Sequence, residues 1–511
     1  MSRPKGSVPS PEAELATSHL DAELGKRSRR GGLILLGAQG LRVVGQFATL
    51  MVLARLLPPA AFGLLAMVAA VGLVLDMLKE LGLSSATIQR PDLTQDQISA
   101  LFWINGAAGA GLAALLAGLA PLLADFYGQP DLVGIARWLA PGLLMSGLTV
   151  QHWALLRRQM RFTAIAGLET ASDYAGFAAA IALALAGEGY WALVAQRLVS
   201  PGVLLVGSWF VCRWRPGRPR RASGLGALVR FGVSVTASGL AGALTRSIDQ
   251  IAIGWLWGAA SLGLYERTSR LVLLPVNTIN APVYAAGMPA LSRLADQPDR
   301  YRRMFGQIVQ KLALLTMPAF AAAAIAADWM VEILLGPAWR EAVPLAALFC
   351  LSAAFFPVTL AMGLLYLTQD RPAELLRATS LDALLCLAAI GAGLPWGGLG
   401  VAASLAVAGP VLRAPLAFWL ATRRGPVSMS YVWRAIAPAL GAAAAAAAAV
   451  WLVRQQLSPA MTLPAIATVL GAAVLAVLLV LLAWPETRAE LRSAAGRAAV
   501  IVRRRGALLE P

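Results

Sequence analysis

The sequence predicts an all-α protein that crosses a membrane many times. Of its 511 residues, 58% are hydrophobic and only 14% are charged, and the mean hydropathy is +0.68. Soluble globular domains carry charge at roughly a quarter of their positions. Uncharged apolar runs recur along the chain, among them 101–124, 138–156 and 342–369, and a helix needs about 20 such residues to cross a bilayer. Composition and run length together indicate a polytopic membrane protein.

We expect about fourteen transmembrane helices. Twelve of them form two six-helix lobes around a central cavity, and two follow at the C-terminal end. The expected ranges are 31–57, 61–83, 99–124, 132–154, 165–187, 190–211, 228–256, 262–289, 305–327, 342–367, 375–394, 398–420, 433–454 and 462–484. The polar residues before them lack the apolar core and cleavage site of a signal peptide, so the first helix is expected to insert as an uncleaved anchor.

Basic residues predict the orientation of the chain. If the amino terminus is cytoplasmic, the six inner loops hold 18 lysines and arginines, whereas the outer connections hold two, Arg340 and Arg454. Positive charge is retained on the cytoplasmic side, so both tails are expected there. The expected parts are a tail 1–30, an N-lobe 31–211, a basic linker 212–227, a C-lobe 228–422, two further helices within 423–484 and a tail 485–511.

A corner that occurs twice predicts that the two lobes are repeats. Residues 55–65 read RLLPPAAFGLL and residues 255–265 read WLWGAASLGLY, with four identities in one constant register. The second copy follows six helices, an even number, so both copies enter the membrane from the same side and the lobes are parallel repeats. Arg55 stands where the second copy has Trp255, and we interpret these two positions as an interfacial anchor or gate.

Signatures of catalysis are absent from the sequence. It has two histidines, three scattered cysteines, and neither a Walker A nor a Rossmann motif. We therefore expect a transporter with no catalytic residue, metal site or resident cofactor. The net charge of +17 is interpreted as a topology signal and a contact with anionic membrane lipids. Nucleic acid is not an expected partner.

Charged residues inside the predicted helices are the candidates for substrate binding, because a charge at the bilayer centre costs about 2.5–3.5 kcal/mol and should face protein or water. Arg42 has no opposite charge within one turn and needs a counter-ion on another helix or on a ligand. Arg246 and Asp249 form either a buried structural pair or a substrate contact. Glu169 and Asp173 share one face of their helix. Arginines outnumber carboxylates at the deep positions, which favours an anionic guest such as a phosphate.

Several segments form a set that is similar to one family. They include LARLLPPAAFGLLAM (53–67), LLRRQMRFTAIAGLETAS (155–172), GEGYWALVAQRL (187–198) and the run 246–294. This set resembles the polysaccharide-specific transporters, the Wzx-type flippases of the multidrug/oligosaccharidyl-lipid/polysaccharide superfamily. The resemblance covers about residues 30–425 and weakens over the last two helices. Related sequences often have arginine at the position of Trp255, so a symmetric pair of corner arginines is not expected here.

The resemblance implies a bacterial inner-membrane flippase that moves undecaprenyl-diphosphate-linked oligosaccharides by alternating access. Its product would enter O-antigen, capsule or exopolysaccharide synthesis, with the polymerase and chain-length machinery as candidate partners. The implied sites are Arg42, Arg246 and Arg270 for a diphosphate or acidic sugar, and Asp173, Asp249 and Asp382 for sugar hydroxyls or a coupling H⁺ or Na⁺. Three alternatives stay open: a cation-coupled multidrug antiporter of the same superfamily, a lipid II flippase, and a membrane polymerase or ligase of the same pathway.

Overall fold

The structure is a computed structural model that describes residues 24–80, 93–218, 225–457 and 462–484, together with 84, 87–88 and 488. All regular elements among these residues are helices, which confirms the predicted all-α class. In chain order they are α2 (Leu24–Leu56), α3 (Pro59–Glu80), α5 (Gln95–Tyr127), α6 (Asp131–Arg158), α7 (Phe162–Leu185), α8 (Trp191–Val211), α9 (Leu225–Ser292), α10 (Pro298–Ile325), α11 (Ala327–Leu334), η2 (Pro337–Ala342), α12 (Val343–Thr368), α13 (Pro372–Gly393), η3 (Leu394–Trp396), α14 (Gly397–Ala408), η4 (Gly409–Arg413), α15 (Ala414–Thr422), α16 (Met429–Gln456) and α17 (Leu463–Ala483). Residues 1–23 of the predicted amino-terminal tail and nearly all of the predicted tail 485–511 lie outside the described residues.

Ten stretches of the described chain are long and apolar enough to cross a membrane. Two of them, Ser247–Ser292 and Pro372–Thr422, contain 46 and 51 residues, enough for two crossings of about 20 residues each. The helices α2 and α7 are not among the ten. The chain is therefore a multi-pass membrane protein, and the count of fourteen spans stays a prediction.

Helix α2 begins at Leu24, seven residues before the start expected from hydropathy. The added turns carry the basic sequence GKRSRR, which can form helical hydrogen bonds although it is too polar for the bilayer core. Hydropathy detects only the apolar part of a helix. The predicted end of the tail at residue 30 therefore lies within α2, and the start of the first membrane span stays a prediction.

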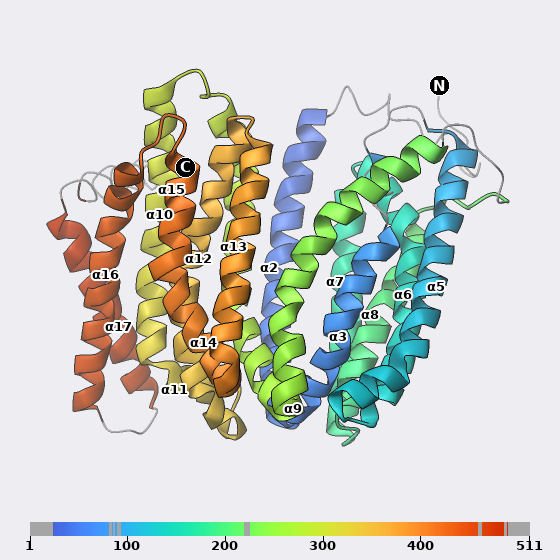
Figure 1. Ribbon diagram of the computed structural model, residues 1–511, viewed down its shortest axis with the longest axis horizontal. Coiled ribbons are helices and arrows are strands. Elements are labelled where there is room, and N and C mark those ends of the chain that lie inside the picture. The colour runs from blue at the N-terminus through green and yellow to red at the C-terminus, as the bar shows by residue number, and fades with distance from the viewer. Residues whose placement is uncertain are drawn as a thin grey trace, which may run out of the picture. The chain divides into compact units, whose positions relative to one another are not determined.

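The described chain divides into two compact units, residues 1–267 and residues 268–511, with the boundary inside α9. In the first unit, which we call unit 1, α5 packs along α6 and α7 along α8 (Figure 1). Glycines allow the α5–α6 approach, because a Cβ on Gly147 would lie 2.6 Å from the carbonyl oxygen of Asn105.

Helix α5 starts with a capping box between Thr94 and Gln97 and ends at Gly128, whose φ of 64° is left-handed. The predicted lobe boundaries stay a prediction.

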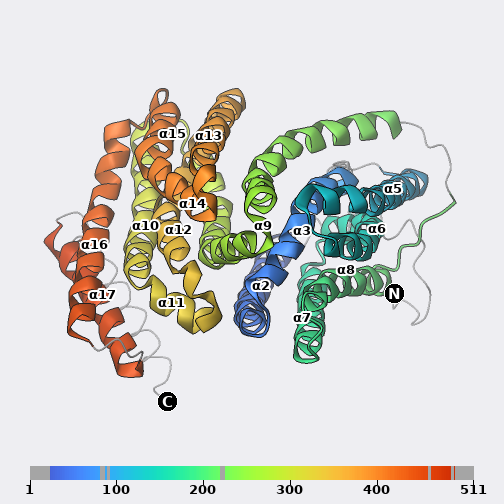
Figure 2. The same ribbon diagram turned by 60° about the horizontal axis from the view of Figure 1, so that its bottom comes forward.

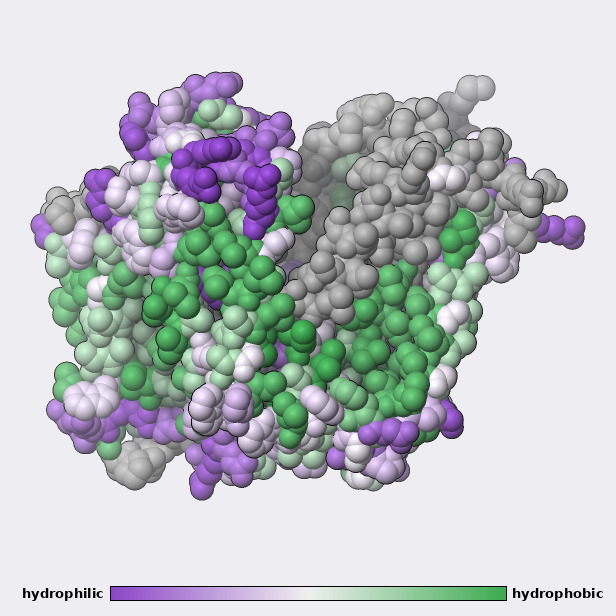
Figure 3. Space-filling model, in the orientation of Figure 1, coloured by the Kyte–Doolittle hydropathy of each residue, from purple (hydrophilic) through white to green (hydrophobic). Residues whose placement is uncertain are grey.

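In the second unit, unit 2, α10 packs against both α12 and α16, and α17 lies beside α16 (Figures 1 and 2). The core between α10, α12 and α16 contains Phe305, Val309, Val358 and Ile436, all fully buried. Figure 3 shows a band of hydrophobic residues across the middle of this unit and hydrophilic residues at both its ends. That distribution fits helices surrounded by hydrocarbon along their middle turns.

The two copies of the repeated corner break the helix with different residues. In the first copy, Leu57 and Pro58 separate α2 from α3. In the second, Gly258 interrupts α9 with φ 76° and ψ −179°. Proline and glycine stand at the same position of the repeat. One lacks the backbone N–H that a continuous helix needs, and the other adopts a conformation that most side chains avoid.

The two corners also contact each other, in unit 1. A Cβ placed on Gly63 would lie 1.7 Å from the carbonyl oxygen of Ala259, and one placed on Gly263 would lie 1.9 Å from the carbonyl oxygen of Pro59. Gly63 is equivalent to Gly263 in the repeat, and Pro59 to Ala259. The same contact is therefore made in both directions, so the two corners are related to each other by an approximate local two-fold axis.

A second repeated corner occurs within each unit, at a spacing of 210 residues. Arg161 follows a residue with φ 52° and Arg371 follows one with φ 54°. The Arg161 guanidinium donates to the carbonyl of Val211 at 3.1 Å, and the Arg371 guanidinium donates to the carbonyl of Ala421 at 3.4 Å. Both acceptors lie at helix C-termini, where carbonyls lack helical partners. Arg161 thus joins the start of α7 to the end of α8, and Arg371 joins the start of α13 to the end of α15.

The first residues of the predicted basic linker fold onto α5. The buried Trp214 indole donates to Gln95 Oε1 at 2.6 Å, and Gln95 Nε2 donates to the carbonyl of Arg215 at 2.9 Å. Trp103 Nε1 donates to the carbonyl of Gly217 at 2.9 Å. This part of the linker is therefore attached to unit 1 by hydrogen bonds.

The corner contact predicts a large effect from one methyl group. Gly63→Ala should destabilise the protein by about 1–3 kcal/mol or more, as in overpacked sites, because the new Cβ meets a backbone carbonyl that cannot rotate away. Gly72→Ala in the same helix is the matched control, since a Cβ there has nothing within 4 Å. Unfolding in detergent micelles measures both variants. Equal stability of the two would contradict the contact.

Candidate functional site

The guanidinium of Arg42 in α2 lies between two carboxylates of α7. Its Nη1 donates to Glu169 Oε2 at 2.5 Å and its Nε donates to Asp173 Oδ2 at 2.7 Å. The two acids are one turn apart, so both reach the same cation. Gly45 permits the close approach of the two helices, because a Cβ there would lie 2.9 Å from the Tyr174 ring. Arg42 thus finds its counter-ions on another helix, the first of the two alternatives.

Arg42, Glu169 and Asp173 form a cluster that we call the α2–α7 triad. Their side chains are 21%, 27% and 23% exposed, so the triad is neither sealed in the core nor open on the surface. With all three groups ionised, its formal charge is −1. Arg42 therefore brings no uncompensated positive charge to this place, in contrast to the cationic site expected from the excess of arginines. Roles of Arg42 and Asp173 in substrate binding stay predictions.

Asp249 in α9 is held by groups on both sides of the break at Gly258. The Tyr265 hydroxyl donates to Asp249 Oδ2 at 2.9 Å, and the backbone N–H of Gln250 donates to Oδ1 at 2.8 Å. Arg246 belongs to the same helix, but its side chain lies outside the described residues. The predicted pair of Arg246 and Asp249 is therefore still a prediction.

Two neighbouring arginines of α9 have different surroundings. Arg267 is 7% exposed. Its Nη2 donates to the carbonyl of Leu50 at 3.0 Å, and its guanidinium lies 4.4 Å from the centre of the Phe62 ring. Arg267 thus connects α9 to α2 and α3 and acts as a structural tie. Arg270 is exposed and remains a candidate for anion binding.

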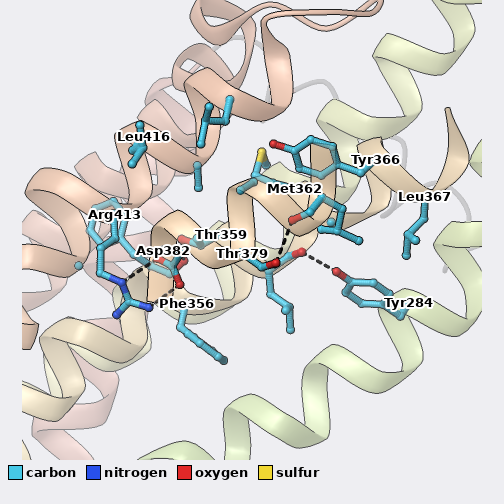
Figure 4. A pocket seen from close by; sticks show the side chains of 18 of the residues that line it. Tyr284, Phe356, Thr359, Met362, Tyr366, Leu367, Thr379, Asp382, Arg413 and Leu416 are labelled. Carbon is cyan, nitrogen blue, oxygen red and sulfur yellow. Dashed lines mark hydrogen bonds and ion pairs between the residues drawn. The ribbon is translucent and has the colours of Figure 1, made fainter. Parts of the chain in front are cut away.

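Asp382 in α13 is paired with Arg413 of η4. Arg413 Nε donates to Asp382 Oδ1 and Nη2 donates to Oδ2, both at 2.8 Å (Figure 4). Such a two-bond pair uses both carboxylate oxygens and aligns the two planes. Arg413 ends a π-helical turn, a form that occurs often at functional sites. Because its charge is compensated by Arg413, Asp382 is a weak candidate for binding a coupling cation.

The two predicted gate positions lie at the corners. Arg55 is exposed in the last turn of α2. Trp255 is 55% exposed and stacks on Phe126 of α5, with ring centroids 5.5 Å apart and an interplanar angle of 11°. Both positions fit an interfacial residue, and the gate role stays a prediction.

Two members of these charge clusters were not among the predicted binding residues. The i,i+4 spacing of Glu169 and Asp173 is the signal that would have included Glu169. Arg413 gave no comparable signal, because a π-turn shifts the helical register and the sequence does not show that turn. Among the described residues, no group of three or more His, Cys, Asp and Glu side chains could hold a metal ion.

Comparison with known proteins adds a family. A family model described as polysaccharide biosynthesis protein matches residues 52–344. The teichuronic acid biosynthesis protein TuaB of Bacillus subtilis is 31% identical over 278 residues, which cover 53% of this chain and 56% of that protein. The lipopolysaccharide biosynthesis protein WzxC of Escherichia coli is 23% identical over 326 residues, covering 63% of this chain and 65% of that protein. The matches thus span less than two thirds of either relative.

A solved structure shares the fold. The inward closed conformation of the lipid II flippase MurJ superposes with a TM-score of 0.69 and covers 88% of this chain and 98% of the MurJ chain. Sequence identity between the two is 11%, so the likeness concerns the arrangement of helices.

The triad predicts a measurable coupling between α2 and α7. A double-mutant cycle with Arg42→Ala and Asp173→Ala should give an interaction free energy of about 1–3 kcal/mol, because either single change leaves a partly buried charge without its partner. Arg302 and Asp299, an i,i+3 pair with side chains 45% and 76% exposed, should give a value near zero. Unfolding in detergent provides the four free energies of each cycle, and equal values for the two pairs would argue against the triad.

Proposed function

This chain belongs to the family of polysaccharide biosynthesis proteins, and from that premise we propose that it is a flippase for lipid-linked glycans. In this proposal it moves undecaprenyl-diphosphate-linked oligosaccharide units to the periplasmic leaflet of a bacterial inner membrane by alternating access. The family match carries the proposal. It runs from α2 into α12 and includes both copies of the repeated corner. The names of TuaB and WzxC, which refer to the biosynthesis of surface polymers, support it.

The proposal also includes the orientation of the protein, the pathway that it serves and its partners. Both termini lie in the cytoplasm, as the distribution of basic residues predicts. The transported units become available for polymerisation into O-antigen, capsule or exopolysaccharide, so a polymerase and its chain-length machinery are the proposed partners. The chain moves the glycan across the membrane and does not alter it chemically.

The α2–α7 triad is the proposed point of energy coupling. It holds one carboxylate more than it has cations, so it can take up a proton or a sodium ion and become neutral. Partial exposure of all three side chains gives such an ion access. Loading the triad also weakens the ion pairs between Arg42 and the two acids, which loosens α2 from α7. Ion binding and helix packing are thereby linked at one place.

Two other functions remain as alternatives. A cation-coupled multidrug antiporter is favoured by the negative formal charge of the triad, because carboxylates attract a cationic drug. A lipid II flippase is the second, and the similarity of the fold to MurJ keeps it in consideration. Lipid II is also an undecaprenyl-diphosphate lipid, so only the glycan distinguishes it from the proposed substrate.

Purified protein in liposomes separates these functions. We expect it to move a fluorescent undecaprenyl-diphosphate oligosaccharide at least about tenfold faster than protein-free liposomes do, and to leave a cationic dye in place. Accessibility of the glycan to an externally added hydrolase measures the transfer. Transport of the dye alone would replace the proposal by the antiporter, and transport of lipid II alone would replace it by the lipid II flippase.

Removing the charge of both triad acids should uncouple transport from the ion gradient. The double variant Glu169→Gln and Asp173→Asn is expected to flip the substrate at one rate with and without a pH or sodium gradient, because no carboxylate remains to take up the ion. Glu332→Gln, a change at a residue whose side chain is 39% exposed, should leave the gradient response intact. If the double variant still responds like the unchanged protein, coupling occurs elsewhere.

A further inference from the structure

Unit 2 contains an elongated cavity beside α12, which we call the α12 groove. One wall is formed by the face of α12 that runs from Ser352 to Leu367. The other walls come from α13 between Leu375 and Asp382, from η4 and α15 between Gly409 and Leu420, and from Tyr284 of α9 (Figure 4). The cavity volume is about 220 Å³.

The groove is elongated. The fifteen residue steps from Ser352 to Leu367, which line it on α12, correspond to roughly 22 Å along the helix axis. An extended hydrocarbon chain can follow such a wall over its whole length, whereas a single sugar ring covers only a small part of it. The length of the wall therefore favours a linear ligand.

Most polar groups along the groove are already in use. Thr359 donates to the carbonyl of Phe355, Thr379 to that of Leu375, and Tyr284 to that of Leu360. Sugar hydroxyls would need free donors and acceptors, and these three hydroxyls have given their hydrogens to the backbone. The Tyr366 hydroxyl is buried and has no partner among the described atoms. The wall as a whole offers an apolar surface.

Small residues keep the groove open. Gly363, Ala378, Gly409 and Ala417 line it on four different elements. At Gly363 a Cβ would lie 2.4 Å from the Tyr284 hydroxyl oxygen, so that position cannot carry a side chain without moving the tyrosine. Small residues at these positions leave room in the groove for the methyl branches of an isoprenoid chain.

One part of the groove is charged. Arg413 and Asp382 line it, and their pair uses the Nε and Nη2 of the guanidinium. Arginine has five N–H donors, so its Nη1 hydrogens are not used by the carboxylate. A phosphate oxygen is the natural acceptor for such donors. The Asp382 carboxylate compensates the charge of Arg413, so the groove offers a phosphate the unused N–H donors of the guanidinium beside an apolar wall.

We propose that the α12 groove binds the isoprenoid chain of the lipid-linked substrate and that Arg413 contacts its phosphate. This inference rests on the proposed function, and it assigns the lipid part of the substrate to unit 2. Burial of each CH₂ contributes about 0.8 kcal/mol to binding, so several isoprene units held in the groove make affinity depend on chain length.

Transport of two matched substrates tests the proposal. They carry the same glycan diphosphate on an undecaprenyl or on a farnesyl chain. The unchanged protein should have a lower KM for the undecaprenyl substrate. Ala378→Phe and Ala417→Phe should raise that KM by about tenfold or more and the KM for the farnesyl substrate by less, because the phenyl ring blocks the groove about one turn from Asp382 and Arg413 and the longer chain loses more contacts. Ala373→Phe, at an exposed position of α13 outside the groove, should behave like the unchanged protein.

Photo-crosslinking of the unchanged protein gives a second measurement that needs no variant to fold. A polyprenyl diphosphate with a diazirine near the end of its chain should label peptides from α12, α13 or α15. A phospholipid with a diazirine in its acyl chain should label them much less.

The outcomes separate the two claims. Equal labelling by both lipids, or an unchanged preference for the long chain in both groove variants, would overturn the groove assignment. If the unchanged protein transports neither substrate, the proposed function is wrong, whereas specific labelling of the groove would still establish its ligand.

Discussion

A charged side chain inside a membrane needs an opposite charge within the protein, and this requirement decides which helices of the chain have to touch. Arg42 joins α2 to α7 across 131 residues of sequence, and Arg413 joins η4 to α13. The helices α2 and α7 are not among the ten stretches that are apolar enough to span a membrane. Arg42 of α2 is paired with Glu169 and Asp173 of α7, so the cost of placing these three charges in the membrane falls when the two helices pack together.

Close backbone contacts act beside these charge pairs. An apolar side chain gains little by moving from hydrocarbon to the surface of another helix. Helices in a membrane therefore associate through close packing, which small residues permit. The contacts of Gly147 with Asn105 and of Gly63 with Ala259 are of this kind. Gly45 permits the close approach of α2 and α7 beside the triad in the same way. Charge pairing and close backbone packing therefore act together at the α2–α7 contact.

Hydropathy was sufficient to predict the helical class, and the repeated corner predicted that the chain breaks its helices within 55–65 and 255–265. Both breaks are present, at Leu57 and Pro58 and at Gly258. Gly258 was not predicted as the residue that makes the second one, because its left-handed backbone conformation is visible only in the structure. The site was less predictable. Arg42 could be identified as a residue in need of a counter-ion, but its partners on α7 depend on how two helices pack, which no single helix encodes. The π-turn before Arg413 likewise results from packing, so the pair with Asp382 could not be derived from helical spacing.

The contact between the two corners also has a consequence for the history of the chain. Gly63 meets Ala259 while Gly263 meets Pro59, so each copy presents the same surface to the other. That reciprocity is the mark of an isologous interface, the kind that joins identical subunits into a two-fold dimer. A six-helix chain carrying this corner would pair with a second copy of itself through the contact that the present chain makes internally. Gene duplication and fusion would preserve such a contact, and afterwards each copy could change on its own, as Arg55 and Trp255 have done.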